Sequence, residues 1–294
     1  MQLRAHSLGA GAALLTLTAT APIADWRPTL RPAAALDGPV HALHLHDDGT
    51  GAPALFAAGD FHVAGDVAAS GIARWEGTTW SKLGGGIDGV VHALETFDDG
   101  SGPALYAGGE FHDAGGSRAH RSARGDGATW SALGTGIERV GYAHATYVAD
   151  MIAFDDGSGP SLFAAGWFNV AGGAPAYNVA RWDGSAWHPV GTGTSNGVLD
   201  LEIFDDGTGP ALYAGGFFTQ AGGVDAWGIA RWDGASWSPV GDEIVGSVST
   251  LCVYDDGTGP GLYAGGTLGS APWAPAAFEK LARYDGVAWE PVGG

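Results

Sequence analysis

The sequence predicts an all-β fold, most simply a β-propeller of five four-stranded blades. An Asp-Asp-Gly triplet begins each of five similar units, at Asp47, Asp98, Asp155, Asp205 and Asp255, so that the repeat period is about 50 residues. The apolar runs are short and are separated by Gly, Pro and Asp, which favour turns. Four short antiparallel strands repeated at such a period are typical of propeller blades. The 294 residues can bury a core without disulfide bonds.

Four strands are predicted in each unit. An apolar run such as residues 90–97 forms the first strand, and the Asp-Asp-Gly turn leads into the second strand, such as residues 105–109. A glycine-rich connection of about ten residues follows and is predicted to be a loop. Residues 229–232 exemplify the third strand, and Asp233-Gly234 predicts a hairpin that leads into a fourth strand at residues 237–240.

The residue pattern of the unit resembles a kelch repeat. In the fourth unit a double glycine, Gly215-Gly216, ends a strand, and Trp232-Asp233 is followed by Trp237. The fuller pattern LYAGGxFxxAGG…IARWDGxxWxPVG is similar to repeats of secreted bacterial kelch-like proteins and of the fungal cortical cell-polarity marker family. The resemblance covers residues 26–294, and departs from ordinary kelch in the glycine-rich connection and a repeated Arg. It implies a propeller that serves mostly as a scaffold and only in some members as an enzyme.

The number of blades and the closure of the ring stay open. Residues 26–30 resemble a fourth strand that precedes the first unit, and residues 289–292 form another at the end of the last unit. The chain therefore carries one fourth strand more than five blades require. This strand is either an addition to the closed ring or a competitor of the last strand in closing it. Alternatively, the chain is part of a larger or truncated array, or a second chain completes the ring. We expect residues 25–294 to form a single monomeric domain.

Residues 1–24 are predicted to be a secretory signal peptide. Arg4 supplies the positive end, and the 14 apolar residues 8–21 are too few to span a bilayer. Cleavage after Ala24 is favoured over cleavage after Ala21, because Pro22 should hinder processing. We therefore expect a secreted, periplasmic or cell-surface protein, and the single Cys252 suits an exported protein without disulfides.

Composition excludes several function classes. Thirteen basic and 32 acidic residues give a net charge of −19, which argues against nucleic acid or an anionic membrane as partner. No later segment is apolar enough for an integral membrane helix, and one cysteine cannot build a Cys-based zinc site. There is no Cys-His or phosphate-loop motif, so no catalytic residue is assigned and a non-catalytic protein is favoured.

One arginine recurs in each unit and is predicted to be structural, with the acidic turns as its partner. These residues are Arg74, Arg124, Arg181, Arg231 and Arg283. The alternative, a catalytic arginine cluster, would not place one arginine in every blade. Arg124-Gly125-Asp126 spells an adhesion tripeptide, but it is a Trp-to-Gly variant of the ordinary strand end and is taken as a chance match.

No metal or other cofactor is predicted. The Asp-Asp-Gly loops could offer carboxylates to calcium, but each has only two, side by side, whereas calcium loops usually space three or more oxygen ligands. A structural turn is therefore favoured. Histidines gather in the first two units, with His41 and His92 at equivalent places of the first strand. A metal site in the channel is the alternative to scattered histidines.

The ligand site is predicted on the rim that carries the variable connections after the second strands. Variable loops on a rigid scaffold often bind partners, and the path from Trp130 to Asp155 is seven residues longer than its counterparts. Aromatic residues outside the repeat consensus lie on this rim: Trp167, Tyr177, Phe217, Trp227 and Trp273. They suit packing on a protein or cell-surface ligand. The alternative is a carbohydrate-binding or glycan-processing protein, which paired carboxylates in a rim cleft would favour.

Overall fold

The computed structural model describes residues 35–47, 53–141, 146–241, 244–270 and 280–293. The predicted signal peptide and Trp273 lie outside the described residues. All regular structure in the described residues is β-strand, which confirms the all-β class. Within these residues no helix is long and apolar enough to cross a membrane.

Each of the five units folds into an antiparallel sheet with its four main strands in sequence order. We call these the first to fifth repeat sheets. Their strands are β1 (Val40–His46), β2 (Ala54–Gly59), β5 (Ile72–Trp75) and β6 (Trp80–Lys82); β7 (Ile87–Asp98), β8 (Pro103–Ala114), β10 (Ser122–Gly125) and β11 (Trp130–Ala132); β13 (Tyr147–Asp155), β14 (Pro160–Trp167), β17 (Val179–Trp182) and β18 (Trp187–Pro189); β19 (Val198–Asp205), β20 (Pro210–Gly216), β23 (Ile229–Trp232) and β24 (Trp237–Pro239); and β25 (Ile244–Asp255), β26 (Pro260–Ser270), β27 (Leu281–Tyr284) and β28 (Trp289–Pro291).

The Asp-Gly pair closes the hairpin between the third and fourth strands, as predicted. Trp232 and Trp237 lie opposite each other across the hairpin of the fourth unit. The Asp233 carboxylate accepts hydrogen bonds from the Ala235 and Ser236 amides at 2.9 and 2.7 Å. Gly234 has φ +94°, a value that side chains other than glycine rarely adopt. Local turn chemistry therefore fixes the register that brings the two indoles together.

The sequence predicted a loop for the connection after the second strand, but the structure contains short hairpins there. Gly222 and Gly223 have φ of +61° and +84°, the conformation of the two-residue turn that best matches strand twist. Such a hairpin gives the backbone groups of the connection hydrogen-bond partners. The additional strands of these connections are β3 (Val63–Ala64), β4 (Val67–Ala68), β9 (Ser117–Arg118), β15 (Val170–Ala171), β16 (Ala174–Pro175), β21 (Gln220–Ala221) and β22 (Val224–Asp225). A further short strand, β12 (Ile137–Glu138), lies between the second and third repeat sheets and pairs with β15.

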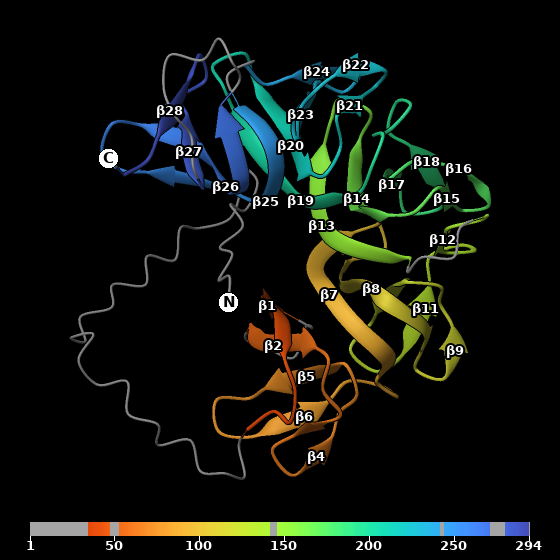
Figure 1. The fold of residues 1–294 in the computed structure, drawn as a ribbon. Helices are drawn as coiled ribbons and strands as arrows, with labels where there is room; N and C mark the ends of the chain where they lie inside the picture. The colour runs from red at the N-terminus through yellow and green to blue at the C-terminus, as the bar shows by residue number, and fades with distance from the viewer. Residues whose placement is uncertain (1–34, 48–52, 142–145, 242–243, 271–279, 294) are drawn as a thin grey trace.

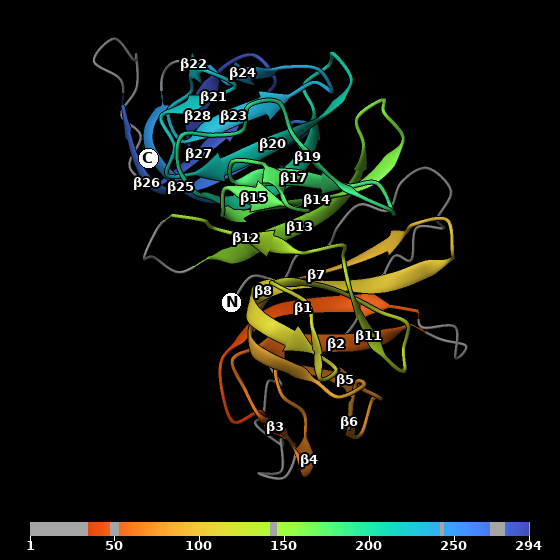
Figure 2. The same ribbon diagram turned by 90° about the vertical axis from the view of Figure 1, so that its right-hand side faces the viewer.

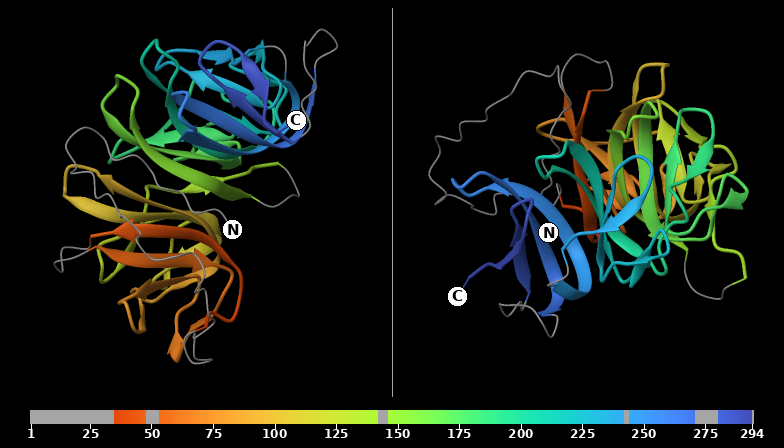
Figure 3. Two further views of the ribbon diagram at one scale, coloured as in Figure 1. Left: turned by 90° about the vertical axis from the view of Figure 1, so that its left-hand side faces the viewer. Right: turned by 90° about the horizontal axis from the view of Figure 1, so that it is seen from above.

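The repeat sheets follow one another in sequence order around a common axis (Figure 1). The innermost strands β1, β7, β13, β19 and β25 contact one another in that order. Figure 2 shows the same succession from the side. No comparable contact joins β25 to β1 in the described part of the chain, and Figure 3 shows the first and fifth sheets at the two ends of the array.

The apolar core lies between neighbouring sheets. Between the fourth and fifth sheets, for example, Phe204 and Tyr213 lie in the same buried cluster as Trp289. The Trp289 Nε1 donates a hydrogen bond of 2.7 Å to the carbonyl of Val240 in the preceding sheet. Equivalent bonds from Trp130, Trp187 and Trp237 reach the carbonyls of Leu83, Leu133 and Val190. The repeated tryptophan therefore joins each of these sheets to the one before it.

The two edges of the array carry different structures. In the third sheet the pairing runs from Asp155 opposite Pro160 at one end to Tyr147 opposite Trp167 at the other. The first end, with the Asp-Asp-Gly turns and Asp-Gly hairpins, is the turn edge. The second end, with the short hairpins and the connections between sheets, is the crossing edge.

Candidate functional site

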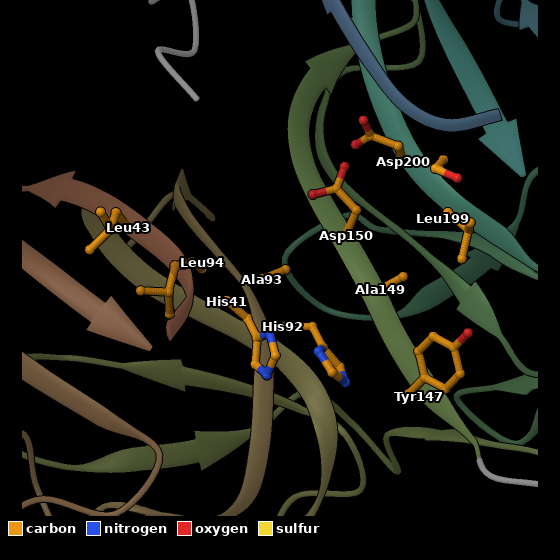
Figure 4. Close-up of a pocket in the computed structure, with 12 residues that line it drawn as sticks. His41, Leu43, His92, Ala93, Leu94, Tyr147, Ala149, Asp150, Leu199 and Asp200 are labelled. Atoms are coloured by element: carbon orange, nitrogen blue, oxygen red, sulfur yellow. The ribbon is translucent and has the colours of Figure 1, made fainter. Parts of the chain in front are cut away.

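A pocket of about 290 Å³ lies on the axis between the innermost strands. All five repeat sheets contribute to its wall, so its shape depends on the arrangement of the whole array. Figure 4 shows its polar side chains on facing strands. The lining residues are His41, Ala42, Leu43, His92, Ala93, Leu94, Tyr147, Ala149, Asp150, Leu199, Asp200 and Ser249.

A row of aromatic rings leads from this pocket along the crossing edge. The rings of His41 and His92 lie 5.1 Å apart, and those of His92 and Tyr147 lie 5.7 Å apart. Tyr147 is the cross-strand partner of Trp167, whose ring lies 6.4 Å from that of Phe217. We call these five residues the ring band. It runs across the first four repeat sheets and joins the pocket to the exposed Phe217.

A cation covers the outer part of the ring band. The Arg139 guanidinium carbon lies 5.0 Å from the centre of the Trp167 ring, within the range of a cation–π contact. Trp167 is half-buried, whereas Phe217 is exposed. The stacked guanidinium restricts the Trp167 ring and presents a positive charge on an otherwise acidic protein.

Burial makes the inner rings of the band hard to ionise. Burial and the nearby His41 lower the pKa of His92 to about 4, and Asp60 opposes them. Burial and the charge of Glu110 raise the pKa of Tyr147, whereas Arg139 opposes this shift. At neutral pH both side chains are uncharged, and each can act as hydrogen-bond donor or acceptor toward a ligand.

Two buried carboxylates line the pocket opposite the histidines. The Asp150 Oδ2 accepts a hydrogen bond of 2.9 Å from the Leu201 amide, and the Asp200 Oδ2 accepts one of 2.6 Å from the Leu251 amide. Each carboxylate therefore holds the innermost strand of the next repeat sheet. This is a structural task, because a buried backbone amide without a partner would destabilise the fold.

The predicted rim residues fall into two groups. Trp167 and Phe217 come together in the ring band. Tyr177 and Trp227 are exposed on the crossing edge just before the third strands of their sheets, and among the described residues neither ring contacts the band. The fifth predicted residue, Trp273, lies outside the described residues.

Among the described residues, the repeated arginine lies within ion-pair distance of an acidic-turn carboxylate in three units. Arg231 Nε lies 3.2 Å from Asp206 Oδ2, and the corresponding distance is 3.1 Å for Arg124 with Asp99 and 3.9 Å for Arg283 with Asp256. The other two arginines differ. Arg74 pairs with Glu76 at 2.6 Å, and Arg181 donates to the Ser161 hydroxyl at 3.1 Å.

The carboxylates of the Asp-Asp-Gly turns accept hydrogen bonds from their own turns. In the fourth unit Asp205 Oδ1 accepts the Gly207 and Gly209 amides at 2.9 and 3.0 Å. Asp206 accepts the Thr208 amide at 3.0 Å and the Tyr213 hydroxyl at 3.1 Å. Among the described residues, no three His, Cys, Asp or Glu side chains form a group suited to a metal ion.

Asp150, Asp200 and Arg139 are site residues that the sequence analysis did not identify. Asp150 and Asp200 share one repeat position, where the other units have Ala42, Ala93 and Thr250. This departure from the repeat was a signal that alignment of the first strands could have used. The approach of Arg139 to Trp167 depends on the path between sheets, which the sequence does not show.

No protein-family model matches this chain, and no curated protein is similar to it in sequence. The function is therefore argued from the geometry of the site.

Proposed function

We propose that this protein is a secreted, non-catalytic β-propeller of five blades that binds a protein or cell-surface ligand on its crossing edge. The five repeat sheets around one axis and the kelch-like wording of the units support the propeller. The apolar segment within residues 1–24 supports export. The ring band, which joins the axial pocket to the edge, is the observation that carries the binding proposal.

The ring band has the physical properties of a recognition surface. Aromatic rings with polar groups give a large contact area and lose little conformational entropy on binding, and Trp and Tyr are enriched among residues that dominate binding energy. Several rings stand on or beside innermost strands, which hold them in place before the ligand arrives. The pocket at the inner end of the band can receive a protruding group of the ligand.

The carboxylates in the pocket support a binding role rather than catalysis. Asp150 and Asp200 each use one oxygen to hold an amide of the next strand. The hydrogen bond to a strand amide gives each carboxylate a structural task, which accounts for its burial without a catalytic role. The one G-x-S-x-G match, residues 193–197, carries Ser195, whose hydroxyl accepts hydrogen bonds from the Thr219 and Gln220 amides at 3.1 Å.

A carbohydrate is the second candidate ligand. The pocket places uncharged His92 and Tyr147 together with Asp150 and Asp200, and the rings of the band continue outward from it. Hydroxyl groups of a sugar could form hydrogen bonds with these polar side chains, while an apolar face of the sugar packs against an aromatic ring of the band. The same surface would then bind glycan rather than protein.

Substitution of the predicted rim tryptophans tests the proposal. Trp167→Ala and Trp227→Ala should each weaken binding by tenfold or more, about 1.4 kcal/mol, because each removes a large aromatic contact. The measurement is a pull-down from the exported fraction together with a glycan array. Val287→Ala, on the turn edge and 84% exposed, is the control. Unchanged binding by both tryptophan variants would contradict the proposed site, and loss on the glycan array alone would favour carbohydrate.

A further inference from the structure

Every joint between neighbouring repeat sheets has the same two halves. In the joint between the fourth and fifth sheets, Phe204, Tyr213 and Ile229 project from the fourth sheet toward the fifth. Leu251, Leu262, Tyr284 and Trp289 of the fifth sheet meet them, and the rings of Phe204 and Tyr284 lie 6.4 Å apart. We call the first set the forward face of a sheet and the second set its backward face.

In the described part of the chain, no other sheet covers the forward face of the fifth sheet. Tyr254 and Leu281 occupy the positions of Phe204 and Ile229, but they are 60% and 40% exposed, whereas Phe204 and Ile229 are each 3% exposed. Tyr263 is half-buried where Tyr213 is fully buried. Cys252 is exposed on the same face. These are residues of the kind that the other sheets bury against a neighbour.

No sheet formed by the described residues covers the backward face of the first sheet either. Leu45 is 65% exposed, and Leu43 and Leu55 are half-buried where Leu251 and Leu262 are buried. A cavity of about 190 Å³ lies beside Trp75 and Trp80, the tryptophan pair of this sheet. The face therefore has both exposed apolar side chains and unfilled space.

Glycines at the hairpins show what is missing from the first sheet. A Cβ atom on Gly234 would lie 2.1 Å from the carbonyl oxygen of Asp156, in the acidic turn of the preceding sheet, and one on Gly286 would lie 2.8 Å from that of Asp206. A Cβ on Gly77, the equivalent residue of the first sheet, would meet nothing within 4 Å. The turn of a preceding sheet therefore contacts the later hairpins but not the first one.

We infer that this protein associates head to tail, with the fifth repeat sheet of one copy packed on the first repeat sheet of a second copy. The occupant of either open face must carry the other half of the same joint, and this chain carries both halves. The two faces lie at opposite ends of the array (Figure 3), and no extended contact joins their innermost strands in the described residues. The four joints within the chain supply the packing template. This inference goes beyond the proposed ligand site and is an alternative to the predicted monomer; it keeps the five repeat sheets as blades but leaves the ring open within one chain.

The association has a definite symmetry and salt dependence. The two faces differ, so the contact is heterologous, and each added copy leaves one open face at each end unless the rotation closes a ring. Copies with a net charge of −19 repel one another. Added salt should therefore strengthen the association by screening this repulsion.

The single cysteine provides the test. With rising protein concentration, between about 1 µM and about 1 mM, the mass by analytical ultracentrifugation should increase and thiol labelling of Cys252 should slow. Leu45→Glu and Leu281→Glu should each remain monomeric with Cys252 reactive, and Val287→Glu, on the turn edge, should behave as wild type. An equimolar mixture of the two monomeric variants should form a dimer, because each retains one intact face.

Two results would overturn the inference. A wild-type protein that stays monomeric with Cys252 equally reactive at every concentration would show that the faces do not pair. Protection of Cys252 that is independent of concentration would show that the first and fifth sheets meet within one chain. Unchanged melting temperatures of the glutamate variants, expected because both leucines are exposed, would confirm that the variants are folded.

Discussion

His92 combines two roles at the scale of a single residue, because it lines the pocket and is held uncharged by burial. Its pKa of about 4 lies below the value of about 6.5 expected in the unfolded chain. The unfolded state therefore binds a proton more readily between these two values. Stability contributed by neutral His92 is present above pH 6.5 and is lost as the pH falls toward 4.

Titration of His92 should therefore account for about 2 kcal/mol of the fall in the free energy of unfolding of the wild type between pH 7 and pH 4.5. The same acidification should have a smaller effect on His92→Gln, which lacks the titrating ring. Chemical denaturation at both pH values measures this, with exposed His62→Gln as the control. If the free energy of unfolding depended equally on pH in the wild type and in His92→Gln, the lowered pKa of His92 would be contradicted.

The repeated arginine is a second residue-scale device. Arg231 contacts Asp206 and also donates to the Thr208 hydroxyl at 2.8 Å, so it ties the third strand to the acidic turn. Burial opposes ionisation of Asp206, but hydrogen bonds from Thr208 and Tyr213 and the charge of Arg231 hold its pKa below the usual value. The stabilisation is present at neutral pH and is lost as Asp206 becomes protonated in acid.

Arg231→Ala should lower the free energy of unfolding by about 1 to 2 kcal/mol, because it removes the ion pair with the mostly buried Asp206 carboxylate and the hydrogen bond to the Thr208 hydroxyl. Ligand binding should be retained, since Arg231 serves its own sheet. Denaturant titration and the pull-down measure the two effects. A loss of binding at unchanged stability would show instead that the arginine belongs to the ligand site.

At the scale of elements, the close contact between a hairpin and the preceding turn is set by glycine. Gly77 and Gly234 have similar φ, +89° and +94°, so alanine is strained at both. Only at Gly234 would the new Cβ also collide with a neighbouring sheet. The pair therefore separates backbone strain from contact between sheets.

Gly77→Ala should cost about 1 kcal/mol of stability, and Gly234→Ala about 2 to 4 kcal/mol, because the second variant must also move the Asp156 turn. Thermal and urea unfolding of both variants measure the difference. Equal losses of stability in the two variants would show that the Asp156 turn can move aside without a free-energy cost. Packing between the two sheets would then be looser than the structure indicates.

The sequence was informative about elements wherever the pattern was local. Apolar runs and the Asp-Gly signal located the main strands, including Ile229–Trp232, because a strand and a tight turn are encoded within a few residues. The short hairpins, such as β21 with β22, were missed. Their strands have only two residues, too few to show alternation.

The candidate site was predictable only in part. A repeat shows which residues occupy equivalent positions, but it does not show the path of the connections between sheets. Trp167 and Phe217 occupy the same position in consecutive units, so neighbouring sheets bring them together. Asp150 and Asp200 form part of the pocket through the same repetition, but strand alternation alone does not show which neighbour they hold. The contact between Arg139 and Trp167 crosses sheets and required the three-dimensional path of the chain.

At the scale of the whole molecule, the array separates two surfaces with different purposes. The ends of the array carry unfilled halves of a joint, and the crossing edge carries the ring band. The turn edge carries hydrogen-bonded acidic turns such as Asp205–Gly209 in the fourth unit. Binding at the crossing edge is therefore compatible with association through the ends.

Hydrogen–deuterium exchange, measured with and without the protein or glycan recovered in the pull-down, tests directly whether the ring band is the ligand site. Amide exchange should slow around Tyr147, Trp167 and Phe217 when the ligand is bound, and exchange in the Asp-Asp-Gly turns should not change. The expected pattern follows from the ring band, which lies at the end of the sheets opposite these turns. Slower exchange confined to the Asp-Asp-Gly turns, with no change at the ring band, would contradict the ring band as the ligand site.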